Sequence, residues 1–315
     1  MVDFFSKGVE RVEGSCRPPY LCAMVNDMVS LVHDGIEAEI SLMGAELQGL
    51  RKEGGGNVLW TKNDEIWNRV APNLFPIVGR LKNDAYTVEG RSFSMRQHGF
   101  ARDQRFELLE RDETSVLFGL RYSEATFQVY PYAFEFQVRY RIEDKVLWVE
   151  YITKNVGEGE MLYSVGGHPG FALRGALAGH ALRFTLAGEV VSFRAPRRLI
   201  EGGYYSGATE DVEVLGGELL LDDALFASDA IVFNEPPFDA VSLLDAQGDV
   251  LVDFYCWEWD AVGFWTKKDA PFFCIEPWWG WADDASGDGD FSKKAGLHRL
   301  EAGDSETVTY GLGLR

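Results

Sequence analysis

The stretch Ala133-Phe-Glu-Phe-Gln-Val-Arg-Tyr-Arg-Ile142 alternates apolar and polar residues at almost every step. Because successive side chains of a β-strand point to opposite faces, this alternation predicts a strand with one buried face and one solvent-facing face. The turn-like Glu143-Asp144-Lys145 then leads into a second alternating run at residues 147–153. The two runs together predict an antiparallel hairpin.

Short runs of the same kind recur along the rest of the chain, whereas helical periodicity is nearly absent. A hairpin is expected within residues 86–95, and further strands at 181–185, 190–193, 230–233, 250–255, 262–266, 272–275 and 307–312. Gly, Pro, Asn and Asp separate these runs. Many short strands with turn residues between them predict an all-β fold of large antiparallel sheets, a sandwich or a barrel, with few short helices.

No fixed-period repeat, low-complexity tract or long linker divides the chain, so we expect a single β domain over residues 28–315. Residues 1–27 precede the first alternating stretch and are expected to form an N-terminal extension. Residues 283–290 are rich in Asp, Gly and Ser, and we expect them to form a loosely attached loop.

The composition limits the kinds of partner. The chain has 315 residues, of which 46% are hydrophobic and 25% charged, as in packed globular proteins. Its 30 basic and 50 acidic residues give a net charge of −20. Such a charge repels phosphate backbones and anionic lipid surfaces, so we expect no nucleic-acid or membrane partner. A small neutral ligand remains compatible with it.

The first residues and the cysteines indicate the compartment. Residues 1–14 mix charges with too few apolar residues for a cleavable signal, and no stretch approaches the roughly 18 apolar residues of a spanning helix. We therefore expect a cytoplasmic protein. Because the four cysteines lack the paired spacing of a metal site, buried free thiols are expected at Cys16, Cys22, Cys256 and Cys274.

Two of the five histidines stand in unusual local sequence. His168 lies in Gly166-Gly-His-Pro-Gly170, where glycines permit close backbone approach and proline stiffens the turn. This arrangement suits a pocket rim, and a purely structural turn is the alternative. His98 lies in Gln97-His-Gly-Phe-Ala-Arg-Asp103, although the Arg102-Asp103 pair is typical of a structural ion pair. Structural roles are expected for the remaining histidines, His33, His180 and His298.

A carboxylate and two arginines stand in apolar surroundings. Glu276 ends the predicted strand 272–275 and precedes a proline and three tryptophans. A dry wall raises the pKa of a carboxylate, and tryptophan faces complement the C–H faces of a pyranose. The alternative is that the tryptophans are core residues and Glu276 pairs with an arginine. Arg69 and Arg80 lie among prolines and apolar residues, where each needs a partner such as a sugar hydroxyl or a carboxylate.

Taken together, these segments resemble the aldose 1-epimerase (galactose mutarotase) family, in particular its LacX-like branch. The resemblance extends from about Ser30 to Arg315 and rests on the order of several short motifs. The motifs are Gly44-Ala-Glu-Leu47, Leu59-Trp60 with Trp67, Ala71-Pro-Asn-Leu-Phe-Pro76 with Gly79-Arg80, Gln97-His-Gly-Phe-Ala-Arg102, Gly166-Gly-His-Pro169 and Ile275-Glu-Pro-Trp278.

The resemblance implies a β-supersandwich that interconverts the α and β anomers of a hexose by acid–base ring opening, without a metal or organic cofactor. The implied partner is a small sugar, and the implied state is a monomer or homodimer. His168 matches the family's general acid and Glu276 its general base. The substrate-binding residues that it implies are Arg80, with Arg69 as a competing match, His98, Asp229 and Trp278.

Opening a cyclic hemiacetal removes a proton from the C1 hydroxyl and gives one to the ring oxygen. We therefore expect Glu276 to be ionised and His168 to be protonated, with nearby negative charge keeping the imidazole charged.

Three alternatives remain. An epimerase of phosphorylated aldoses would need a cationic pocket, for which Arg69, Arg80, Arg96 and Arg102 are candidates. A sugar-binding module would lack turnover. A glycoside hydrolase would need two carboxylates about 5–9.5 Å apart, whereas the motifs offer one glutamate and one histidine.

Overall fold

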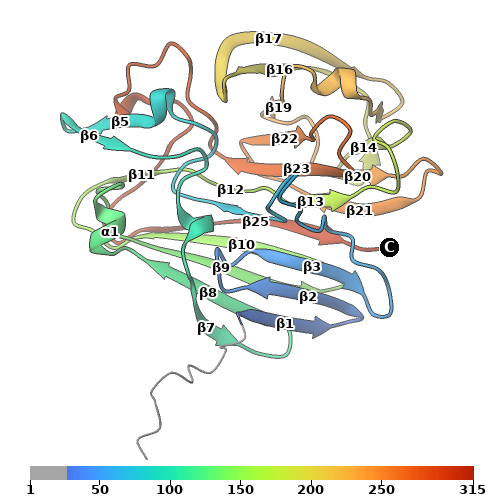
Figure 1. The fold of residues 1–315 in the computed structure, drawn as a ribbon, viewed down its shortest axis with the longest axis horizontal. Coiled ribbons are helices and arrows are strands. Elements are labelled where there is room, and N and C mark those ends of the chain that lie inside the picture. Colours follow the sequence, from blue (N-terminus) through green and yellow to red (C-terminus); the bar gives the residue numbers. More distant parts are fainter. Residues whose placement is uncertain (1–26) are drawn as a thin grey trace, which may run out of the picture.

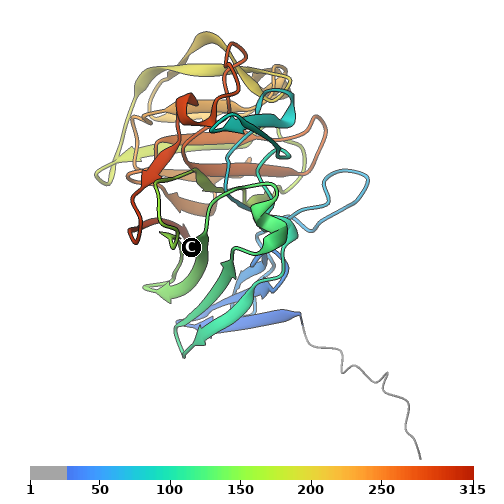
Figure 2. The ribbon, with the colours of Figure 1, turned by 90° about the vertical axis from the view of Figure 1, so that its left-hand side faces the viewer.

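The structure, a computed structural model, describes residues 27–315 and consists mainly of β-strands. Figure 1 shows one large sheet crossing the lower half of the molecule through β9 (Phe134–Glu143), and another in the upper half through β23 (Phe272–Trp279). Figure 2 shows both halves after a quarter turn. The pairings between named strands are antiparallel. The all-β prediction is confirmed.

The lower sheet has ten strands in the order β15-β14-β20-β21-β25-β10-β9-β8-β7, and β18 pairs with β14. Besides β9, its strands are β7 (Glu107–Arg111), β8 (Ser115–Arg121), β10 (Val146–Asn155), β14 (Ala181–Leu186), β15 (Glu189–Val190), β18 (Glu218–Leu220), β20 (Ala240–Leu244), β21 (Val250–Tyr255) and β25 (Ser305–Gly313).

The upper sheet has eight strands in the order β17-β16-β19-β22-β23-β12-β4, and β13 pairs with β23. Besides β23, its strands are β4 (Asn73–Leu74), β12 (Val165–Gly167), β13 (Gly170–Ala172), β16 (Phe193–Glu201), β17 (Tyr204–Val214), β19 (Ile231–Asn234) and β22 (Ala261–Trp265).

Small elements complete the described part of the chain. A three-stranded sheet consists of β1 (Met28–His33), β2 (Ile36–Ser41) and β3 (Leu47–Lys52). There are also two two-stranded sheets: β5 (Ala85–Val88) pairs with β6 (Arg91–Ser94), and β11 (Met161–Tyr163) pairs with β24 (His298–Leu300). The helical segments are short: α1 (Glu124–Phe127) and the 3₁₀ turns η1 (Lys82–Asp84), η2 (Ala101–Asp103), η3 (Asp223–Phe226) and η4 (Phe291–Lys293). Across residues 27–315, no helix has the length and apolar character needed to cross a membrane.

The hydrophobic core lies between the large sheets. On β9 every second residue is buried, from Phe134 to Ile142, as the alternation predicted. Phe136 of β9 stacks on Phe75, which follows β4, with 4.4 Å between ring centroids. The Tyr151 hydroxyl on β10 donates to Asn73 Oδ1 of β4 at 2.7 Å. Aromatic stacking and buried hydrogen bonds therefore fix the upper sheet over the lower one.

The predicted hairpin forms, with Glu143 opposite Val146 across its turn. The single strand predicted at 190–193 is wrong, because β15 ends at Val190 and β16 begins at Phe193. The long hairpin β16–β17 was not predicted at all. Its residues are mostly exposed or half-buried, and its apolar alternation is confined to one end, at Phe193, Ala195, Val212 and Val214, which is too short to predict the whole hairpin.

The loop 283–290 is not loosely attached. Asp283 is buried, its carboxylate accepts from the Lys82 backbone N–H at 3.1 Å, and its carbonyl accepts from Tyr205 N–H at 2.9 Å. Of the predicted N-terminal extension, residues 1–26 lie outside the described residues. Asp27 is described and forms an ion pair with Arg105 at 2.6 Å.

Candidate active site

A cavity of about 320 Å³ opens on the upper sheet, within the usual size range of small-ligand pockets, about 300–1,000 Å³. Five of the residues selected from the sequence line it, namely His98, His168, Asp229, Glu276 and Trp278. Arg80 and Arg69 do not line it. The cavity therefore brings together segments that are far apart in the sequence.

His168 is positioned by the strand that precedes it. In β12, Gly166 pairs with Leu74 of β4 on one side and with Trp278 of β23 on the other. A Cβ atom at Gly166 would lie 2.8 Å from the Pro277 carbonyl oxygen, too close for any larger residue. Glycine thus allows β12 to fit between its neighbours, and the chain delivers His168 at the edge of the cavity.

Glu276 lies beside His168. It is on β23 opposite Gly263 of β22, and its side chain is only 2% exposed. The distance from His168 Nε2 to Glu276 Oε1 is 3.2 Å. A single proton can therefore be shared between imidazole and carboxyl group.

The surroundings favour the uncharged forms of both groups. Burial lowers the pKa of His168 to about 3, and the positive charge of Arg102 acts in the same direction. Burial raises the pKa of Glu276 well above its ordinary value. In the empty site the shared proton is therefore expected on the carboxyl group, opposite to the ionised glutamate and charged histidine that we expected from the sequence.

His98 is fixed as a neutral hydrogen-bond donor. Its backbone has a left-handed φ of 66°, and its Nδ1 accepts from the Gly79 N–H at 3.1 Å, which leaves the ring proton on Nε2. Burial lowers the pKa of His98 well below its ordinary value. Its ring lies edge-on to that of His168, with centroids 5.6 Å apart.

Aromatic rings form the dry walls around His168. The Trp67 ring centroid lies 5.1 Å from that of His168, and the Trp265 centroid lies 5.5 Å away at a steep angle. Gly170 makes room for Trp67, since a Cβ atom there would lie 2.6 Å from Cζ3 of the indole. These rings exclude water from the imidazole, which accounts for its lowered pKa.

The two predicted arginines lie outside the cavity lining and contact residues at or next to it. Arg80 pairs with Asp84 at 2.7 Å and donates to the Gly202 carbonyl at 3.3 Å, in the turn that brings Gly203 to the cavity. Arg69 pairs with Asp103. It also donates at 3.2 Å to the carbonyl of Arg102, and the Arg102 side chain does line the cavity.

Asp229 lies at the mouth. Its residue is exposed, its backbone has a left-handed φ of 85°, and its Oδ1 accepts from the Ala230 N–H at 2.8 Å. The second carboxylate oxygen has no hydrogen-bond partner among the described residues.

Unpartnered polar atoms gather at this cavity. Within residues 27–315, five buried side-chain nitrogen or oxygen atoms have no hydrogen-bond partner. Three of them belong to lining residues: Arg102 Nε, His168 Nδ1 and Trp278 Nε1. Since an unpaired buried polar group costs about 1–3 kcal/mol, this concentration is typical of a site that binds a polar molecule.

The model of the aldose 1-epimerase family matches residues 27–203. Protein LacX, chromosomal, of Lactococcus lactis subsp. lactis is 30% identical over 265 residues, covering 80% of this chain and 87% of that protein. This chain belongs to the aldose 1-epimerase family.

Solved structures agree with this assignment. A galactose mutarotase related enzyme from Lactobacillus acidophilus is 32% identical, with a TM-score of 0.85 over 91% of this chain and 96% of that one. A galactose mutarotase-like protein from Lactobacillus casei ATCC 334 is 26% identical, with a TM-score of 0.83 over 91% of this chain and 100% of that one. The predicted galactose mutarotase-like β-supersandwich is therefore confirmed.

The sequence named Arg102 only as a candidate for a cationic pocket that binds a phosphorylated sugar, and not among the substrate-binding residues of a hexose epimerase. The residue stands at the end of the His98 motif, and its neighbour Asp103 suggested a local ion pair. In the structure Asp103 pairs with Arg69 instead, which leaves Arg102 to face the cavity. Nothing in the local sequence around Trp265 could have indicated its place in the wall.

One group of side chains in this site has metal-ligand chemistry. The candidate ligand atoms of His168, Cys274 and Glu276 lie within 4.8 Å of one another. An imidazole, a thiolate and a carboxylate would suit Zn²⁺. Burial raises the pKa of the Cys274 thiol well above its ordinary value, so the thiol would have to release a proton when a cation bound.

Proposed function

We propose that this protein is an aldose 1-epimerase that interconverts the α and β anomers of a free hexose. The observation that carries the proposal is the 3.2 Å separation of His168 Nε2 and Glu276 Oε1 in a ligand-sized cavity. The hydroxyl and ring oxygens of a hemiacetal are bonded to the same carbon. An acid and a base that serve both must therefore lie side by side, as these two groups do.

The proposed reaction conserves the protons of the pair. With the sugar bound, the shared proton first moves from Glu276 to His168. Glu276 then takes the proton of the C1 hydroxyl, His168 gives a proton to the ring oxygen, and the C1–O5 bond breaks to leave an aldehyde. Rotation about C1–C2 turns the other carbonyl face toward the ring oxygen. Both transfers then reverse, O5 attacks C1, and the pair returns to its starting state with the opposite anomer.

The neutral form of the pair has a place in this cycle. After ring opening the carboxyl group is protonated and the imidazole is neutral, which is the state that burial favours in the empty site. The surroundings thus stabilise the enzyme form that accompanies the open-chain sugar. We infer that this preference offsets part of the cost of opening the ring.

Four further groups are suited to hold the sugar. His98 offers a neutral N–H, Arg102 offers its unpaired Nε and Asp229 offers a carboxylate at the mouth. Trp278 contributes an apolar ring and an unpartnered indole N–H. Together they match the alternating C–H faces and hydroxyls of a pyranose.

Phosphorylated sugars fit this cavity less well. Of the four candidate arginines only Arg102 lines it, while Arg69 and Arg80 are paired with carboxylates. The Asp229 carboxylate would oppose a dianionic phosphate, and the buried Glu276 carboxyl group would gain no countercharge from it. We therefore expect a higher rate with glucose or galactose than with glucose 6-phosphate.

Polarimetry of freshly dissolved α-D-glucose and α-D-galactose tests the proposal, after subtraction of spontaneous mutarotation. The wild-type protein should accelerate the approach to equilibrium, whereas Glu276→Gln and His168→Asn should lose most of that acceleration. Residues of the same types outside the cavity supply controls: Glu53→Gln at an exposed position and His33→Asn at a half-buried one. A sugar-binding module would instead bind without turnover, and release of nitrophenol from nitrophenyl glycosides would indicate a hydrolase.

A further inference from the structure

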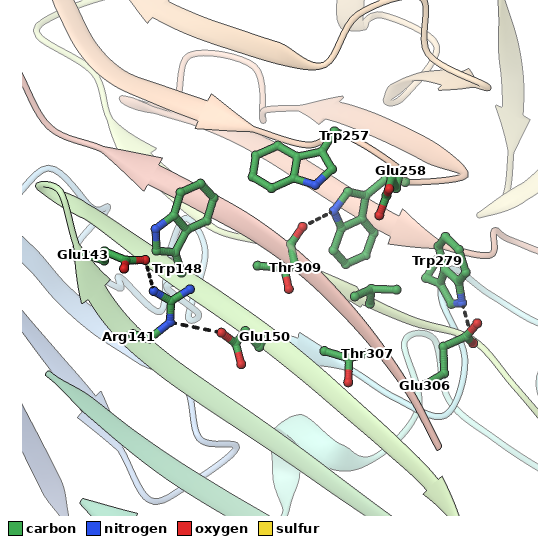
Figure 3. A pocket seen from close by; sticks show the side chains of 12 residues that line it. Arg141, Glu143, Trp148, Glu150, Trp257, Glu258, Trp279, Glu306, Thr307 and Thr309 are labelled. Carbon is green, nitrogen blue, oxygen red and sulfur yellow. Dashed lines mark hydrogen bonds and ion pairs between the residues drawn. The ribbon is translucent and has the colours of Figure 1, made fainter. Parts of the chain in front are cut away.

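A second cavity of about 530 Å³ lies on the solvent-facing side of the ten-stranded sheet (Figure 3). Its floor comes from β9, β10 and β25, and one wall comes from the segment after β21 that carries Trp257. We call it the outer groove. It contains no residue that lines the candidate active site.

Two of the four tryptophans that line the outer groove form an aromatic pair. Trp148 of β10 points away from the core and lies over Gly311, where a Cβ atom would be 2.4 Å from Cζ3 of the ring. Trp257 meets Trp148 edge to face, with centroids 5.3 Å apart, and is 40% exposed. An exposed tryptophan held in place by a second tryptophan is a preformed stacking surface.

Polar groups stand next to these rings. Figure 3 shows Arg141 below Trp148, between Glu143 and Glu150, and Thr307 further along the floor. Arg141 forms ion pairs with both glutamates, at 3.3 Å from its Nε to Glu150 Oε1. The guanidinium holds the carboxylates in fixed positions, so donors and acceptors are preorganised beside an aromatic face.

The outer groove and the candidate active site share one strand but use opposite faces of it. Trp278 lines the active-site cavity, and its neighbour Trp279 lines the outer groove. Trp279 is fixed there by stacking on His298, with centroids 4.2 Å apart, and by donating to Glu306 at 3.0 Å. Successive residues of a strand point to opposite faces, so a ligand in one cavity does not contact the other.

We propose that the outer groove is a second carbohydrate site, which binds a pyranose ring of an oligosaccharide without turning it over. Flat rings that cover C–H faces and fixed polar groups that pair with equatorial hydroxyls are the two features that a pyranose requires. Of the four glutamates that line the groove, Glu143 and Glu150 are paired with Arg141 and Glu306 accepts from Trp279, so among the described residues only Glu258 lacks such a partner.

Titration of the full chain with maltotetraose, cellotetraose and β-1,4-galactotetraose tests this site, followed by the indole N–H signals in ¹H–¹⁵N NMR spectra. At least one tetraose should shift the signals of Trp148 and Trp257. Trp257→Ala should weaken that binding at least tenfold and leave mutarotation unchanged. Tyr122→Ala, an exposed aromatic outside the groove, should leave the binding unchanged.

Three outcomes would overturn the proposal: no shift with any tetraose, equal binding by Trp257→Ala, or loss of a dimer in that variant, which would show that a second copy covers the groove. A Glu276→Gln protein separates this site from the proposed activity. It should lose mutarotation and still bind the tetraose at the outer groove.

Discussion

Replacing Glu276 with glutamine should have opposite effects on catalysis and on stability. Glutamine has nearly the same shape but cannot accept the proton of the C1 hydroxyl. A positioned proton transfer typically contributes about 10²–10⁴ in rate. We therefore expect kcat for mutarotation to fall by about 10²–10⁴, equivalent to about 3–5 kcal/mol in the activation barrier.

The stability effect follows from the proton count of the pair. Burial raises the folded pKa of Glu276 and lowers that of His168 to about 3. The folded pair therefore holds one proton across the neutral range. The unfolded groups titrate at about 4.3 and 6.5, so the unfolded pair also holds one proton between these values and none above them. Above pH 6.5 the wild-type protein loses up to about 1.4 kcal/mol of stability per pH unit, until the carboxyl group ionises in the folded state.

Glutamine removes that loss, because it has no proton to release. Urea unfolding at pH 5.5, 7.5 and 8.5 should show that the Glu276→Gln variant gains stability relative to wild type at each step, by up to about 1.4 kcal/mol per pH unit. Polarimetry on the same preparations measures the rate. Parallel stability profiles for the two proteins, or a rate near that of wild type, would refute the reasoning.

Three further changes test other parts of the site. His168→Asn should gain stability relative to wild type as the pH falls from 6.5 toward 3. The pKa of His168 is lower in the folded than in the unfolded protein, so acid protonates the unfolded imidazole first and reduces the unfolding free energy of the wild type. A stability difference that stays constant with pH in urea unfolding would contradict this. Arg80→Ala should raise KM more than it lowers kcat, because Arg80 holds the Gly202 carbonyl at the rim; steady-state polarimetry would disprove this if kcat alone fell. Gly170→Ala should cost about 1–3 kcal/mol of unfolding free energy and lower kcat, since its Cβ atom would lie 2.6 Å from Trp67; unchanged values of both would show that the indole moves freely.

The sequence predicts those strands that bury one face against the core. On β9, Phe136, Val138 and Tyr140 alternate with polar residues because one face of the strand is buried and the other faces solvent. The strand predicted from this alternation is the strand that the structure shows. β16 and β17 are the opposite case. Most of their residues are exposed or half-buried, and a short apolar alternation occurs only at one end, at Phe193 and Ala195 with Val212 and Val214. Along the rest of the hairpin, pairing of the strands with each other and with β19 forms the sheet. Backbone pairing of that kind leaves no trace in local hydrophobicity.

The motifs indicated most of the residues of the candidate site, but they did not indicate which arginine lines the cavity and which arginines pair with carboxylates. His168 and Glu276 stand out because of the residue types around them. Glycine and proline restrict or loosen the backbone in ways that suit a close approach between segments, and tryptophan suits a site where a ring must stack. Arg80, Arg69 and Arg102 look alike in sequence, and their roles depend on which carboxylate each one reaches. Asp84 lies four residues from Arg80, whereas Asp103 turns toward Arg69 and frees Arg102. Such partner choice is a property of the folded chain.

Charge state is the feature of this site that residue types alone predict least well. A histidine beside a glutamate reads as an ion pair, and Coulomb attraction at 3.2 Å does favour one. Burial on all sides acts more strongly here and moves both pKa values the other way. A bound hemiacetal adds hydroxyl dipoles and hydrogen bonds to both groups, and these favour the charged form again. The pair is therefore suited to move its single proton whenever the sugar opens or closes, and each form of the pair is stabilised by a different form of the sugar.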